Sequence, residues 1–201
     1  MKTQLFLVTL SLIAFSSCKM LIMKSQGIRN PKEETPESLI SFLEKRNGPL
    51  ENNFIFKDSA SWLYFSMHPR IHKEVIGTFL FNEHGLILNI KDSTKCQWSG
   101  INAISELHPD STYNIDSTLK IQYIESLLLP LIPGLCKTQE KNSNFTVMMT
   151  WARFIGKLND RIFLARDIVA DNPNKNIRLI FINLDMQKSW HLNPDQKVKI
   201  D

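Results

Sequence analysis

The sequence predicts an α/β fold, and three observations support this prediction. Residues 145–152 ("FTVMMTWA") and 177–185 ("IRLIFINLD") have the length and apolar content of buried strands, and a helical pattern separates them. Residues 74–92 contain two more strand-length apolar runs around a turn. Hydrophobic residues make up 43% of the 201-residue chain, which is enough to bury a full core. We therefore expect strands and helices packed around one core.

The first half of the chain predicts a helix, a strand, a helix, a hairpin and a helix, in that order. Thr35 can cap the first helix, Pro36 suits its first position, and Asn47-Gly48-Pro49 would end it. The other elements are a strand at 53–58, a helix at 59–67 that ends before Pro69, a hairpin at 74–92 with Gly85 in its turn, and a helix at 97–107.

The second half predicts a buried helix followed by a β-α-β unit. Residues 108–118 are polar, and the apolar run from Leu119 to Leu129 has helical length. Then come the strand at 145–152, an amphipathic helix at 156–170 and the strand at 177–185. Two strands joined by such a crossover lie parallel in one sheet, with a right-handed connection. Their near-continuous apolar character predicts burial on both faces.

Residues 145–185 resemble the thioredoxin fold. In that family a central strand ends in an aromatic-Trp-Ala sequence and runs into a W-C-G-P-C motif at the start of a helix. Thr150-Trp151-Ala152 matches the end of the strand, and Phe154 stands in the place of the second Trp. The motif positions that follow hold Ile155 and Leu158 in place of the cysteines, Gly156 in place of the glycine and Lys157 in place of the proline. Residues 182–185, "INLD", are similar to the family's next strand, which commonly ends on an aspartate.

The chemistry of the thioredoxin family depends on a thiolate at a helix N-terminus, where the helix dipole lowers the pKa of the cysteine. Ile155 and Leu158 have no sulfur that could attack a disulfide, so dithiol exchange from these positions is excluded. We expect the two side chains to fill the interface between helix and strand.

The upstream elements resemble the second half of the same fold. The strand at 53–58, the helix at 59–67, the hairpin at 74–92 and the helix after it follow that order of elements. One mixed sheet of about five strands with flanking helices, assembled in permuted chain order, would explain both segments. Two halves, 37–118 and 119–201, would explain them as well.

The N-terminus predicts a secretory signal peptide at 1–17, because Lys2 precedes an uncharged apolar run from Leu5 to Phe15. This run is too short to span a membrane. "FSSC", which ends at Cys18, resembles the lipobox of bacterial lipoproteins, in which the cysteine is acylated and becomes the new N-terminus. The alternative is an ordinary cleaved signal with an incidental cysteine.

The lipobox resemblance implies a protein of the bacterial cell envelope, held on a membrane by its lipid. Residues 18–36 would form a lipidated tether and 37–201 the folded domain. Lys19, directly after the cysteine, resembles the pattern that directs lipoproteins to an outer membrane. The whole chain resembles small lipoproteins of the Bacteroidota, and this likeness implies no activity.

Charge and motifs exclude several classes of function. The net charge is only +4, from 24 basic and 20 acidic residues dispersed along the chain, which argues against a nucleic-acid groove. We expect no metal site, because Pro69 breaks the helix that His68 and His72 would need to bind zinc. The chain has no glycine-rich phosphate loop and no nucleophile elbow, so we expect no cofactor and no catalytic residue.

Two other cysteines, Cys96 and Cys136, remain in an oxidising compartment. They could form a disulfide or stay separate buried thiols. Cys96 is the best candidate for a reactive thiol, because it precedes a predicted helix and adjoins Lys95.

Taken as a whole, the sequence predicts a redox-inactive thioredoxin-like lipoprotein that acts by binding or as a structural element. A further envelope protein would be a suitable partner. The alternative is an enzyme or redox sensor that uses Cys96.

Overall fold

The computed structural model describes residues 23–89, 99–136 and 143–193. It has an α/β fold built on a mixed seven-stranded sheet with the strand order β4-β3-β2-β6-β7-β1-β5. The strands are β1 (Asn53–Phe56), β2 (Thr78–Asn82), β3 (Leu86–Leu88), β4 (Ile115–Lys120), β5 (Leu128–Pro130), β6 (Phe145–Trp151) and β7 (Ile177–Asn183).

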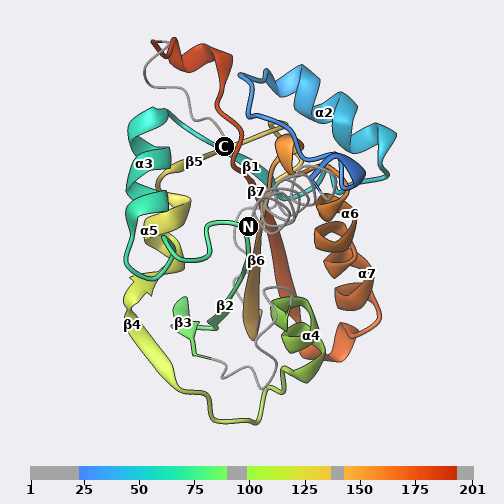
Figure 1. Cartoon of the computed structure of the whole chain (residues 1–201). Helices are drawn as coiled ribbons and strands as arrows, with labels where there is room; N and C mark the ends of the chain where they lie inside the picture. The colour runs from blue at the N-terminus through green and yellow to red at the C-terminus, as the bar shows by residue number, and fades with distance from the viewer. Residues whose placement is uncertain (1–22, 90–98, 137–142, 194–201) are drawn as a thin grey trace, which may run out of the picture.

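Helices cover both faces of the sheet. They are α2 (Pro36–Lys45), α3 (Ser59–Met67), α4 (Ser99–Glu106), α5 (Ile121–Glu125), α6 (Leu158–Phe163) and α7 (Ala165–Ala170), with short 3-10 turns at Arg153–Ile155, Pro173–Lys175 and Lys188–Trp190. Figure 1 shows α3 and α5 on one face and α2, α4, α6 and α7 on the other. The sheet is therefore the middle of three layers.

Strands β6 and β7 form the centre of the sheet and run parallel. They pair in continuous register from Phe145 opposite Ile177 to Trp151 opposite Asn183. Every residue of β6 is buried, as expected for a strand covered on both faces. The parallel pairing predicted for the β-α-β unit is confirmed.

Helix α2 and the hairpin formed by β2 and β3 lie where short-range sequence signals predicted them. Thr35 caps α2, because its side chain accepts a hydrogen bond from the backbone N–H of Ser38, and Pro36 is the first helical residue. In the hairpin, Gly85 has a φ of +74°, which glycine adopts without steric cost. The side chain of Asn82 also accepts from the backbone N–H of Leu86 across the turn.

The α/β class is confirmed, but the sheet has seven strands instead of about five. The two additional strands, β4 and β5, lie at its outer edges. They arise where the sequence predicted a polar stretch and one buried helix over 119–129, and that helix prediction is wrong. Only Ile121–Glu125 is helical there, while β4 pairs with β3 and β5 pairs with β1. Pro130 is tolerated in β5 because an edge strand can lack one donor.

The helix predicted over 156–170 is shorter and is divided into α6 and α7. Gly156 has a φ of +62° and a ψ of −125°, outside the helical region, so α6 begins at Leu158. Between the two helices, the backbone N–H of Leu164 donates to the carbonyl oxygen of Arg161, three residues back, at 3.2 Å. This tighter turn interrupts the α-helical pattern.

Candidate functional site

The candidate site lies where the carboxyl ends of β6 and β7 meet at one edge of the sheet. Ligands of open sheets with parallel strands commonly bind at such an edge. The loops that leave the two strands are tied together, since the backbone N–H of Leu184 donates to the carbonyl oxygen of Trp151 at 2.8 Å. The backbone N–H of Arg153 also donates to Oδ2 of Asp185 at 2.6 Å.

The loop after β6 contains the four positions that match the thioredoxin motif. Ile155 is 3% exposed and belongs to the core, Gly156 is buried, Lys157 is exposed and Leu158 is half-buried against the core. The two apolar side chains thus pack as the sequence analysis expects. Asn159 fixes the loop, because its side-chain amide donates to the carbonyl oxygens of Ala152 and Gly156 at 2.8 and 3.0 Å.

An N-terminal strap, residues 26–34, covers this loop. The backbone N–H of Lys157 donates to the carbonyl oxygen of Gln26 at 2.7 Å, and that of Arg29 donates to the carbonyl oxygen of Phe154 at 3.0 Å. Contact is so close that a Cβ added at Gly156 would lie 2.2 Å from the Gln26 oxygen. The strap belongs to the segment expected to be a tether, and backbone hydrogen bonds hold it against the folded body.

The far end of the strap is held beside β7. Glu34 pairs with Gln187 in a parallel β-bridge, with backbone hydrogen bonds of 2.8 Å on both sides of Glu34. Its side chain is 8% exposed and forms an ion pair with Arg153. The strap is therefore joined to both loops at the carboxyl edge.

Asp185 is a buried carboxyl group at the same edge. It is 1% exposed and accepts hydrogen bonds through Oδ2 from the backbone of Arg153 and from the side chain of Asn183. Loss of water contact raises its pKa from 3.8 to about 6, and the nearby Glu34 acts in the same direction. Its other oxygen, Oδ1, has no hydrogen-bond partner among the described residues.

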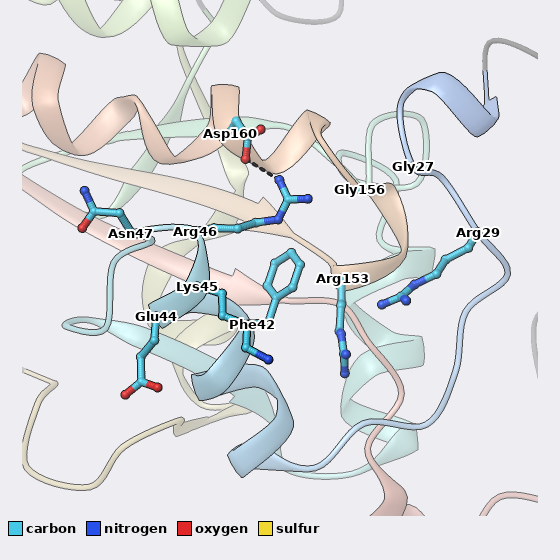
Figure 2. A pocket seen from close by; sticks show the side chains of 10 residues that line it. All are labelled: Gly27, Arg29, Phe42, Glu44, Lys45, Arg46, Asn47, Arg153, Gly156 and Asp160. Atoms are coloured by element: carbon cyan, nitrogen blue, oxygen red, sulfur yellow. Dashed lines mark hydrogen bonds and ion pairs between the residues drawn. The ribbon is translucent and has the colours of Figure 1, made fainter.

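Beside the strap lies an open pocket of about 810 Å³. It is lined by Gly27, Arg29, Phe42, Glu44, Lys45, Arg46, Asn47, Arg153, Gly156 and Asp160. These residues come from the strap, the end of α2, the loop after β6 and the start of α6, and Figure 2 shows their arrangement. Four of the ten carry a positive charge and two a negative charge, so the lining is cationic.

An aromatic floor supports two of the cations. The Phe42 ring stacks on Trp151 with centroids 5.9 Å apart and an interplanar angle of 4°. The guanidinium carbons of Arg46 and Arg153 lie 5.1 and 5.9 Å from the Phe42 centroid, within the range of a cation–π contact. Arg46 also forms an ion pair with Asp160 at 2.6 Å.

The predicted cysteine sites lie elsewhere. Cys18 and Cys96 are outside the described residues, so the lipidation and the reactivity of Cys96 stay predictions. Cys136 is half-buried and has a free thiol that donates to the carbonyl oxygen of Asn53 at 3.3 Å. Burial raises the pKa of this thiol, which keeps it protonated at neutral pH and weakens it as a nucleophile.

Sequence reasoning identified the motif loop and noted Asp185 only as the end of a strand, and it missed the strap and the pocket. Arg29, Arg46 and Arg153 are far apart in the chain, and no spacing rule connects them. Across residues 23–89, 99–136 and 143–193, no group of three or more potential metal ligands occurs, and no helix is long and apolar enough to cross a membrane.

Comparison with known proteins gives no relative: the chain matches no protein-family model, no curated protein and no solved structure.

Proposed function

We propose that the protein is a lipid-anchored protein of the bacterial cell envelope, with a thioredoxin-like body that has no dithiol chemistry and acts by binding. The observation that carries this proposal is the state of the motif loop. Ile155 is buried at the position of the attacking cysteine, and the strap lies over the adjoining Gly156. What remains open at this edge is the cationic pocket, and a pocket suits binding.

The sheet supports the thioredoxin-like part of the proposal. The parallel pair β6–β7 carries the motif loop, and the hairpin β2–β3 lies beside β6 in the same sheet. This hairpin precedes β6 in the sequence, which agrees with a permuted chain order. Asp185 follows β7, as the resemblance to the family's aspartate implies.

An insulin-reduction assay on the mature protein tests the absence of dithiol chemistry. We expect no turnover in the presence of a thiol reductant, with thioredoxin as the positive control. Turnover above the reductant blank would contradict the proposal.

Thiol labelling tests the alternative, an enzyme or sensor that uses Cys96. Rapid labelling of Cys96 in native protein below pH 7 would favour that alternative, whereas slow labelling or a disulfide with Cys136 would favour a binding protein.

A further inference from the structure

The pocket beside the strap is lined by four positive and two negative side chains, so its lining has a net charge of +2. Arg46 is paired with Asp160 and Arg153 with Glu34. Arg29 and Lys45 form no ion pair with any residue in the described ranges, and both are exposed. In Figure 2 the Arg29 guanidinium points toward Arg153, while the Glu44 carboxylate points away from Arg29 and Arg153. The open side of the pocket is therefore positively charged.

Each cation is attached to a backbone segment that hydrogen bonds or helical structure hold in place. Arg29 is held through its backbone hydrogen bond to Phe154. Lys45 lies in the last turn of α2, and Arg153 contacts Phe42 and Glu34. The ion pair with Glu34 is formed through Nη1 of Arg153. The backbone of each cation is therefore held in place before an anion binds, which lowers the conformational entropy lost on binding.

The charge and shape of the pocket favour a phosphate monoester. Such a group carries about −1.5 to −2 charges at neutral pH. The net charge of +2 on the pocket lining, from four positive and two negative side chains, attracts it more strongly than it attracts one carboxylate. Planar guanidinium groups also bind phosphate oxygens in a two-pronged arrangement. The pocket volume of about 810 Å³ leaves room for an organic group beyond the phosphate.

The position of the pocket brings it close to lipid if Cys18 is acylated. Four residues separate Cys18 from Met23, the first described residue, so the chain between the two Cα atoms has five residue steps. Even fully extended, they span at most about 18 Å. The start of the strap segment that lines the pocket would then be held within reach of the membrane surface.

We propose that Arg29, Lys45 and Arg153 form a binding site for a phosphate monoester, supplied by a small soluble molecule or by a lipid headgroup. This site rests on the binding role proposed above and names the chemistry of its ligand.

Calorimetric titration of the mature lipidated protein in neutral detergent tests the site. The probes are glycerol 3-phosphate, dihexanoyl phosphatidic acid and glycerate, a carboxylate of similar size. We expect a phosphate ester to bind at least tenfold more tightly than glycerate. Preference for glycerol 3-phosphate indicates a soluble ligand, and preference for the phosphatidic acid indicates a lipid headgroup.

Two substitutions and one matched control locate the binding. Arg29→Gln and Lys45→Gln should each weaken binding by about tenfold or more, because each removes a charged hydrogen bond. Lys120→Gln removes an exposed charge from β4, an outer strand that contributes no residue to the pocket lining, and should leave binding unchanged. Circular dichroism should show that all three variants are folded, since none of these side chains forms an ion pair with a described residue.

Absence of phosphate binding, equal binding of glycerate, or unchanged affinity in both pocket variants would overturn the site. None of these results would affect the insulin-reduction assay, so failure of the site and failure of the redox-inactive function can be told apart.

Discussion

Asp185 is an ionisable side chain that folding removes almost completely from water. Its pKa rises from 3.8 to about 6. Between these pH values the folded protein keeps the proton while the unfolded chain has lost it. The free energy of unfolding therefore falls as the pH increases from about 4 to about 6, by roughly 3 kcal/mol for this group.

Asp185→Asn should remove this pH dependence. One amide oxygen can accept the hydrogen bonds from Arg153 and Asn183, and the uncharged side chain needs no proton. The quantity to compare is the free energy of unfolding of the variant minus that of the unchanged protein. We expect this difference to increase by about 3 kcal/mol from pH 4 to pH 7. Urea unfolding at both pH values measures the difference, with the exposed Asp171→Asn as the control. A difference that stays constant with pH would contradict the assignment.

Burial at position 155 should suppress thiol chemistry even when a cysteine replaces Ile155. Ile155 is 3% exposed, whereas Lys157, two residues on, is exposed. In a background without the other cysteines, we expect Ile155→Cys to react with a maleimide at least tenfold more slowly than Lys157→Cys. Ile155→Cys combined with Leu158→Cys should also fail to reduce insulin. Equal labelling rates would show that the strap does not shield the loop.

At the scale of elements, the strap and the motif loop depend on a glycine. Gly156 has a positive φ and its Cα faces the backbone of Gln26 and Gly27. A side chain at this position meets both backbone strain and a steric clash.

Gly156→Ala should destabilise the protein and release the strap. Gly134→Ala is a matched control, because Gly134 has a φ of +87° but nothing within 4 Å of an added Cβ. We expect Gly134→Ala to cost about 1 kcal/mol from backbone strain alone, and Gly156→Ala to cost about 1–3 kcal/mol more. Hydrogen exchange should show faster opening of residues 26–34 only in Gly156→Ala. Similar exchange in the two variants would mean that the strap is not held by this contact.

Elements specified by neighbouring residues could be predicted from the sequence. The cap at Thr35, the glycine turn at Gly85 and the apolar strand β6 are all local signals, and each is found where it was expected. The helix predicted over 119–129 failed because β4 and β5 form through hydrogen bonds to β3 and β1. Such pairing overrides helical periodicity, and periodicity contains no information about the partner strand.

At the scale of the whole molecule, the proposed anchor should decide where the protein resides. Cys18→Ser removes the only side chain that the lipobox can acylate. We expect the protein to move from the membrane fraction to the soluble fraction, because the acyl chains of the proposed anchor would supply the membrane affinity.

Fractionation and labelling with a palmitate analogue measure this change. Cys136→Ser is the control, and it should leave both the membrane association and the label in place. Membrane association that persists without Cys18 would contradict lipid anchoring.

The candidate site illustrates the limit of sequence reasoning for the molecule as a whole. The motif resemblance led to the loop at Ile155, and it gave Asp185 only as the aspartate that ends the next strand, because both follow apolar strands in one short segment. The pocket combines Arg29, Lys45 and Arg153, which come from three different parts of the fold, with Asp160 of α6. No single stretch of the chain contains that pattern.

By itself, the sequence determined the α/β class, the parallel pair at the centre of the sheet and the absence of sulfur at the motif positions. These depend on local hydrophobic patterns and on atomic composition, which the sequence specifies directly. Only the tertiary structure decided that the sheet has seven strands, that the strap covers the loop and that a cationic pocket opens beside it. These features depend on contacts between segments far apart in the chain, and such contacts are settled by how the whole core packs.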